Sequence, residues 1–545
     1  MPDAGKVQLP RPATHQLMHR DGFGFDAAKG CTEGDDFSDP AAAPFDATIH
    51  RMLSQNSCSS ASAQDCHLSG GTAEDPYRYQ QGFGNRFASE AIPGVLPQAR
   101  NAPQKVKYDL FSEQLNGSAF ISPRAGIQNT WMYRICPSVA HGGLTKAADA
   151  NNKIQSCFLS LNTSVEYTPQ DHSWSPFPLP EDLDSVDFVH GLRTIGGNGD
   201  PTLKEGLAVH LYCANTSMQN SAFCNNDGDM LILPQQGRLD IQTEMGRMMV
   251  RPGELAVVQA GIRFKVCLPD GPSRGYIQEV FGVHWELPEL GPFGSNGMAY
   301  PRDFETPVAS FDLDSGEWQI FYKVAGQLHT CVQKHTPFDV VAWHGNYAPY
   351  KYAIEKFVNM ACIEKEQADP TIYCVLTARS RVPGVSISDF LAFTPRWMTT
   401  TDTFRPPYYH RNMSTEVMGL IYGKWGGSSH PLEAGGLSYE GSFMPHGESY
   451  QTWKDATTRE LQSERVMEGT MAFMMHMSVP LLLTRYALEE SGCLHPPDDS
   501  KWDDVHRHFE DHLEEVNAVL AGAGRSPLTK GTGSAGDGAM VNGYH

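Results

Sequence analysis

Short runs of apolar and β-branched residues, separated by turn-forming residues, recur from about residue 77 to about residue 485. Typical runs are Ala208–Tyr212, Met230–Pro234 and Gly275–Val280, and turn signals such as Asp227-Gly228-Asp229 lie between them. Strand-length runs at this spacing predict a β-sandwich, a jelly roll or a barrel. We therefore expect a mainly β protein.

The two ends of the chain have other patterns. Residues 1–75 are rich in Asp, Ala, Ser, Gly and Pro and lack periodicity, which predicts a poorly ordered extension. The clearest helical pattern covers Asp503–Leu520, with acidic residues at its start, where a helix dipole favours them. The Gly- and Ser-rich residues 523–545 predict a flexible tail.

The composition of the chain argues against some classes of binding partner. The 545 residues carry a net charge of −21, which argues against nucleic acid and anionic membranes as main partners. No apolar run reaches the length of about 18 residues that a membrane span needs, and the N-terminus lacks an apolar signal core. The 12 cysteines form no CxxC pair, so we expect free thiols and a cytoplasmic protein.

His410, Glu416 and His446 offer two imidazoles and one carboxylate within a short stretch of chain. This set suits a mononuclear non-haem iron(II) site with open positions for a substrate and dioxygen. Pro406-Pro407 and Pro445 predict extended backbone before the two histidines. Either a shared strand face or a turn would bring Glu416 to His410. The chain has 21 His and 63 acidic residues, so spacing alone also fits structural histidines near a surface glutamate.

Two other motifs carry less weight. His506, His508 and His512 lie among Asp and Glu, which is typical of a solvated helix face. Residues 531–536 match the dinucleotide fingerprint by letter, but no predicted strand precedes them and no helix follows.

At the metal-type residues the chain resembles the homogentisate 1,2-dioxygenase family, and the resemblance extends over roughly residues 77–485. The Phe404–Asn412 string, FRPPYYHRN, is its most specific part. Further matching blocks are Gly82–Asn85, Glu113–Phe120, Trp131–Ile135, Tyr212–Met218, Ala342–Tyr347, Pro445–Gly447 and Gly469–Met474.

The resemblance implies a cupin-like fold with jelly-roll or β-sandwich architecture. It implies a large N-terminal β domain at 76–345 and a smaller iron-bearing domain at 346–490. The helical pattern described above adds a C-terminal helix segment at 491–522. It further implies Fe(2+) held by His410, Glu416 and His446, a small aromatic substrate and dioxygen, and a homo-oligomer, either a trimer or a hexamer.

The residues that would surround the substrate depart from the family pattern. Gln367 and Glu440 stand where the family has pocket histidines, and Trp425 aligns with a pocket tyrosine. Glutamine cannot act as a base near neutral pH, so we expect Gln367 to orient the substrate and Glu440 or the metal to assist deprotonation. Tyr409 and His344 complete the predicted substrate-binding residues.

These departures favour a ring-opening dioxygenase for a phenolic substrate other than homogentisate. The first alternative is a true homogentisate 1,2-dioxygenase, in which the departures are tolerated variation. The second is a non-catalytic cupin that binds a metabolite. The third is a cupin isomerase or hydrolase that uses another divalent metal.

Overall fold

The computed structural model describes residues 75–97, 103–148, 151–181, 183–289, 299–359, 373–398, 408–426, 430–460, 462, 464–498 and 500–530. The predicted N-terminal extension lies outside these residues apart from Asp75, and so do Gln367 and the tail from residue 531. Asp75 belongs to the folded part, because its carboxylate accepts hydrogen bonds from Tyr79 Oη (2.7 Å) and Lys351 Nζ (2.6 Å).

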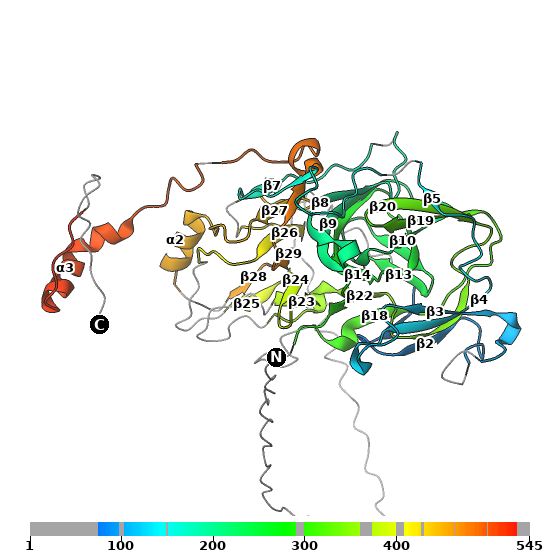
Figure 1. Cartoon of the computed structure of the whole chain (residues 1–545). Coiled ribbons are helices and arrows are strands. Elements are labelled where there is room, and N and C mark those ends of the chain that lie inside the picture. The colour runs from blue at the N-terminus through cyan, green and yellow to red at the C-terminus, as the bar shows by residue number, and fades with distance from the viewer. Residues whose placement is uncertain are drawn as a thin grey trace, which may run out of the picture. The chain divides into compact units, whose positions relative to one another are not determined.

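Strands dominate the described residues, which confirms the mainly β prediction, and the largest sheet has ten strands (Figure 1). In spatial order these are β1 (Tyr79–Gln81), β18 (Phe304–Pro307), β22 (Tyr350–Ala353), β14 (Glu254–Val258), β11 (Gly228–Gln236), β16 (Ser273–Phe281), β9 (Glu205–Ala214), β8 (Leu192–Asp200), β30 (Leu482–Thr484) and β6 (Val165–Glu166).

Both faces of the ten-stranded sheet are covered, and the pattern of β11 shows why its sequence is apolar without alternation. Leu231 and Leu233 point into one hydrophobic core, whereas Met230 and Ile232 point into another. Successive side chains of a strand face opposite sides of the sheet, so a strand covered on both sides needs apolar residues at every position. The sheet is therefore the middle of three layers.

A seven-stranded sheet packs on one face of the middle layer, across the core that contains Met230 and Ile232. Its strands are β13 (Gly246–Val250), β12 (Leu239–Thr243), β15 (Arg263–Cys267), β10 (Ser221–Asn225), β19 (Trp318–Val324), β20 (Gln327–Gln333) and β5 (Thr145–Lys146). Two smaller sheets flank these layers. They consist of β2 (Phe87–Glu90), β21 (Val340–Gly345), β4 (Asn129–Arg134) and β3 (Phe111–Asn116), and of β25 (Arg396–Met398) with β28 (Glu464–Val466).

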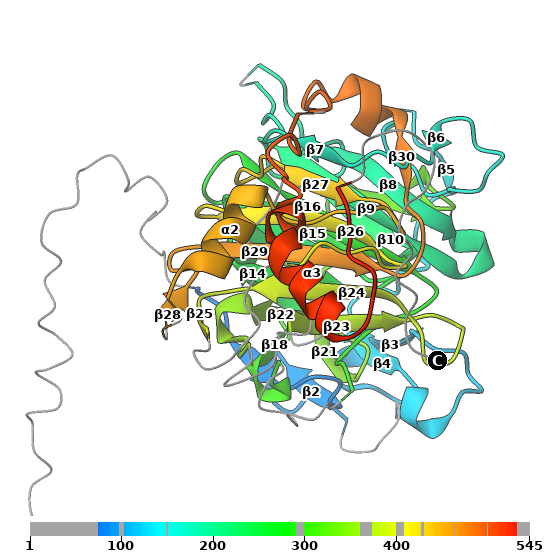
Figure 2. The same cartoon turned by 90° about the vertical axis from the view of Figure 1, so that its left-hand side faces the viewer.

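The third layer is a second seven-stranded sheet, which faces the viewer in Figure 2. Its strands are β17 (Trp285–Glu286), β23 (Cys374–Arg379), β24 (Ser386–Phe393), β29 (Met471–Met477), β26 (Thr415–Tyr422), β27 (Leu437–Glu440) and β7 (His172–Trp174). The edge strands β7 and β17 come from before residue 345, and β30 joins the ten-stranded sheet from the C-terminal side. Because the layers exchange strands, the domain boundary at 345 stays a prediction.

Helices are few among the described residues. α2 (Tyr450–Thr458) begins at Ser449, whose side chain caps the backbone N–H of Thr452. α3 covers Leu513–Gly522 and is preceded by one 3-10 segment at His508–His512. No helix in the described ranges is long and apolar enough to cross a membrane.

The prediction of a continuous helix over Asp503–Leu520 was wrong in its first part, where residues 503–507 form turns and coil. The rings of His506 and His508 lie 6.0 and 5.7 Å from the Tyr450 ring, and Tyr450 Oη is 2.5 Å from His508 Nε2. These contacts with α2 favour a local conformation other than the helix that propensity alone predicts.

Candidate metal centre

His410 and His446 lie on two extended segments that pair with each other outside the sheets. The backbone N–H of His410 donates to the carbonyl of His446 (2.9 Å), and the N–H of His446 donates back to His410 (3.1 Å). This reciprocal pair brings the ring centroids to 4.2 Å. Extended backbone at both histidines agrees with the expectation from the neighbouring prolines.

Glu416 reaches the two histidines from β26, after a turn that begins at Asn412. The side-chain oxygen of Asn412 accepts the backbone N–H of Ser414 (2.9 Å), and its Nδ2 donates to Glu416 Oε1 (2.9 Å). Asn side chains stabilise turns in this way. Of the two arrangements that the sequence left open, the turn is therefore the one that the structure contains.

The three side chains converge as a metal site requires. Glu416 Oε1 lies 3.7 Å from His410 Nε2, and Glu416 Oε2 lies 3.6 Å from His446 Nε2. One ligand atom from each residue lies within 4.8 Å of the others. Two imidazoles and one carboxylate on one side of a shared point match the facial triad of non-haem Fe(II) oxygenases.

The tautomers of both histidines suit a metal. His410 Nδ1 faces the Tyr408 carbonyl (3.3 Å) and His446 Nδ1 faces the Met444 carbonyl (3.0 Å). A carbonyl can only accept, so each Nδ1 carries a proton, and each Nε2 is the nitrogen that would bind a metal once it is deprotonated. His446 Nε2 is buried without a hydrogen-bond partner among the described residues, which fits a position reserved for a metal bond.

The ionisable side chains of the site shift one another's pKa values. Burial alone would raise the pKa of Glu416, but the neighbouring imidazoles of His410 and His446 and the hydrogen bond from Asn412 outweigh burial and hold that pKa well below its usual range. Burial raises the pKa of Glu440 to about 8, with a further contribution from the nearby Glu416 carboxylate. A divalent cation held by Glu416 would oppose that repulsion and lower the pKa of Glu440.

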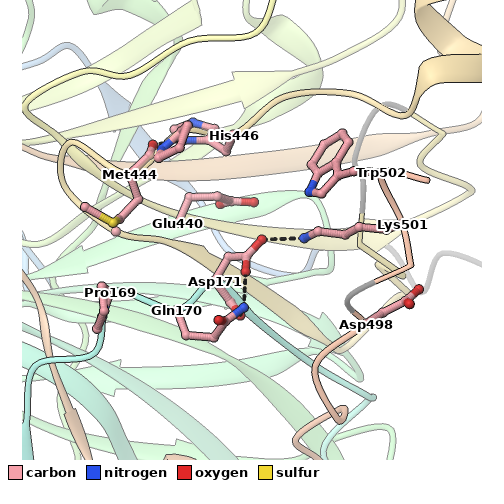
Figure 3. A pocket seen from close by; sticks show the side chains of 11 residues that line it. Pro169, Gln170, Asp171, Glu440, Met444, His446, Asp498, Lys501 and Trp502 are labelled. Atoms are coloured by element: carbon pink, nitrogen blue, oxygen red, sulfur yellow. Dashed lines mark hydrogen bonds and ion pairs between the residues drawn. The ribbon is translucent and has the colours of Figure 1, made fainter. Parts of the chain in front are cut away.

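A cavity of about 240 Å³ opens beside His446 (Figure 3). Its walls come from three distant parts of the chain: the segment before β7, the end of β27 with the residues that follow, and the segment after residue 497. The lining residues are Pro169, Gln170, Asp171, Glu440, Gly441, Met444, Pro445, His446, Asp498, Lys501 and Trp502. Glu440 pairs with Glu416 in the β26–β27 register, so the cavity adjoins the triad.

The other predicted substrate-binding residues lie outside the lining of this cavity. Tyr409 is 46% exposed and its ring packs edge-on against Trp502. Trp425 packs on Phe393 in a small core cluster. His344 lies on β21, where its Nε2 is 3.1 Å from Tyr133 Oη and burial lowers its pKa. Their roles in substrate binding stay predictions, as does the role of Gln367.

Sequence reasoning missed two groups of residues at this site. Asn412 was inside the recognised string, and its ability to form a turn could have indicated its role. Asp171, His430 and Lys501 form a charged cluster, in which His430 Nε2 lies 2.9 Å from Asp171 Oδ2. These three residues are far apart in sequence, so no local spacing could have revealed them.

Comparison with known proteins places this geometry in a family. The family model described as homogentisate 1,2-dioxygenase N-terminal matches residues 78–354, and the corresponding C-terminal model matches residues 355–509. The chain belongs to the homogentisate 1,2-dioxygenase family. This confirms the resemblance and the enzyme class that it implied, a ring-cleaving dioxygenase.

Individual members of the family are similar over nearly their whole length. The homogentisate 1,2-dioxygenase of Emericella nidulans is 44% identical over 80% of this chain and 97% of its own. The enzyme of Drosophila melanogaster is 46% identical over 80% of this chain and 98% of its own, and that of Mus musculus is 44% identical over 79% and 97%. Solved structures that match include Bacillus subtilis oxalate decarboxylase, at 12% identity and a TM-score of 0.26 over 64% of this chain and 88% of that one.

Proposed function

We propose that the protein binds Fe(II) through His410, Glu416 and His446 and uses dioxygen to open the ring of homogentisate. The observation that carries the proposal is the convergence of two imidazole Nε2 atoms and one carboxylate at a single point. Relatives with the homogentisate dioxygenase name at 44–46% identity support the substrate.

The sequence departures at Gln367, Glu440 and Trp425 favoured another phenolic substrate. The relatives favour the first alternative instead, because the similarity continues through nearly the full length of enzymes named for homogentisate. The intact triad also weighs against a non-catalytic cupin, since nothing would preserve the ligand geometry in a protein that needs no metal.

Fe(II) at the triad would pass electrons from the aromatic substrate to dioxygen and so let triplet dioxygen react with a singlet ring. The side chains of the protein would orient the substrate and enclose it in the cavity. Met444, Pro445 and Trp502, together with Pro169, supply apolar surface to the cavity wall, which would limit the access of water. Gln367 is proposed to orient the substrate by hydrogen bonds, and Glu440 to receive a proton from it.

Oxygen consumption tests the function directly. Anaerobic protein is loaded with Fe(II), and oxygen uptake is recorded with homogentisate and then with other dihydroxylated aromatic compounds. We expect homogentisate to give the fastest uptake, with one dioxygen consumed for each substrate. Rapid uptake with another phenol and none with homogentisate would overturn the proposed substrate, and turnover without dioxygen would overturn the reaction class.

Ligand variants test the metal assignment. His410→Ala is expected to lose both bound iron and activity, because one of three ligands is gone. His508→Ala is the matched control, since His508 contacts Tyr450 rather than the triad. Full activity and iron content in His410→Ala would show that the site is elsewhere.

The remaining predictions concern the whole protein. We propose a cytoplasmic location and a homo-oligomer, either a trimer or a hexamer, on the basis of the family resemblance. Light scattering of the purified protein measures the oligomer, and a monomer at micromolar concentration would contradict it.

A further inference from the structure

Glu440 brings a buried, incompletely paired carboxyl group to the cavity. Glu440 is the last residue of strand β27 and is only 8% exposed. Oε2 has no hydrogen-bond partner among the described residues, although it is buried. A buried carboxyl oxygen without a partner costs free energy, so its retention in a cavity wall indicates that a bound molecule supplies the missing donor.

Lys501 brings a cation to the same cavity from the C-terminal segment. Its ammonium forms an ion pair with Asp171 and lies 3.4 Å from His430 Nε2, and the side chain is only 13% exposed. An ammonium has three N–H donors. Asp171 and His430 therefore hold Lys501 in place and leave a donor for the cavity.

Glu440 and Lys501 point toward the same part of the cavity in Figure 3. Together they offer one acceptor and one donor. A carboxylate placed there would meet Glu440 and Asp171, and an ammonium would meet Lys501. A hydroxyl group suits both, because it donates one hydrogen bond and accepts another.

We propose that Glu440 and Lys501 bind the ring hydroxyl of the substrate that the metal does not hold. The hydroxyl donates to Glu440 Oε2 and accepts from Lys501 Nζ, and Asp171 is a positioning residue that orients Lys501. The pair thereby selects dihydroxylated over monohydroxylated rings. This inference rests on the proposed function, because it assumes a dihydroxylated substrate at the triad.

Binding without turnover tests the pair. Iron-loaded protein is titrated under strict anaerobiosis by calorimetry with homogentisate, 2-hydroxyphenylacetate and 3-hydroxyphenylacetate, each analogue lacking one ring hydroxyl. The wild type is expected to bind homogentisate at least about tenfold more tightly than either analogue, because hydrogen bonds to charged groups are strong. In Glu440→Leu and in Lys501→Met, the preference over the analogue that lacks the hydroxyl bound by the pair is expected to fall below about threefold.

Conservative variants test whether Glu440 and Lys501 bind the hydroxyl or only support the fold. Glu440→Gln and Lys501→Arg are expected to recover part of the preference, because each keeps a polar group of similar reach. Asp171→Asn removes the ion pair that orients Lys501 but keeps both groups that contact the hydroxyl, so part of the preference for homogentisate should be lost. If Lys501→Met weakened the binding of homogentisate and of both analogues equally, Lys501 would have a purely structural role and the inference would be overturned.

A double-mutant cycle adds a readout that depends on the hydroxyl. Glu440→Leu and Lys501→Met should be non-additive for homogentisate and closer to additive for the analogue that lacks the bound hydroxyl. Equal wild-type affinities for homogentisate and both analogues would overturn the inference even if oxygen uptake is fast. A clear preference without oxygen uptake would overturn the proposed function alone, and no binding of homogentisate would overturn both.

Discussion

Asn412 connects the backbone of the metal centre with its carboxylate through one side chain. Its Oδ1 accepts from the N–H of Ser414 and its Nδ2 donates to Glu416 Oε1, both at 2.9 Å. The first bond shapes the turn between His410 and β26, and the second fixes the carboxylate that the turn delivers. Loss of a residue that holds a metal ligand in this way typically weakens metal binding by about 10–100-fold.

Asn412→Ala is therefore expected to weaken Fe(II) binding by about 10–100-fold, because the carboxylate loses its donor and the turn loses its side-chain bond. Anaerobic metal titration measures the affinity. Asn517→Ala is a suitable control, since Asn517 also bonds to backbone, at Leu528, but on the C-terminal segment. Equal affinities in the two variants would show that Asn412 does not orient the ligand.

At the scale of elements, the position of β26 decides where Glu416 lies. β26 is held between β27 and β29, and Gly419 of β26 lies opposite Phe473 of β29. A Cβ atom at Gly419 would come within 2.3 Å of the Phe473 ring. The same ring lies 4.8 Å from the Tyr276 ring in the middle layer, so it cannot move away freely.

Gly419→Ala is expected to destabilise the fold by about 1–3 kcal/mol, because the added methyl group overpacks a filled core. Urea unfolding measures the change. Gly426→Ala provides the comparison, because a Cβ atom there meets nothing within 4 Å, and its effect should stay within about 0.5 kcal/mol. Equal stability of the two variants would contradict the close packing of the Phe473 ring against Gly419.

At the scale of the whole molecule, side chains tie the sheets together. Tyr276 Oη in the middle layer donates to the Gly436 carbonyl beside β27 (2.9 Å). His284, between β16 and β17, lies 2.8 Å from Asp229 Oδ2 of β11 and 2.9 Å from the Gly117 carbonyl after β3. Burial lowers the pKa of His284, but the Asp229 charge and hydrogen bond outweigh burial and raise that pKa to about 9.

His284 gives stability a defined pH dependence. Its pKa is raised from an ordinary value of 6.5 to about 9 on folding, so its contribution is complete below pH 6.5 and is lost as pH rises through 9. The size is on the order of 3 kcal/mol. In denaturant titrations, His284→Gln should lose most stability relative to the wild type at low pH and little above pH 9. A difference that is constant with pH would contradict a protonated His284.

The sequence predicted the β class because strand-length apolar runs and turns are local signals. It indicated the three candidate metal ligands, whose side chains converge in the structure, because they lie in or near the blocks Phe404–Asn412 and Pro445–Gly447 that match the family. It could not predict the exchange of β7 and β30 between layers, because pairing of distant strands leaves no local pattern. The same limit hid Lys501 and Asp171, which are 330 residues apart in sequence. The helix expected from Asp503 begins later because Tyr450 contacts His506 and His508.

Product analysis after reaction with isotopically labelled dioxygen tests the central claim most directly. Iron-loaded protein is mixed with homogentisate and ¹⁸O₂, and the product is analysed by mass spectrometry. The account predicts a ring-opened product that contains both atoms of one dioxygen molecule, formed by the wild type and not by His410→Ala. Unchanged homogentisate, or a product without label, would contradict an iron-dependent ring-cleaving dioxygenase at this triad.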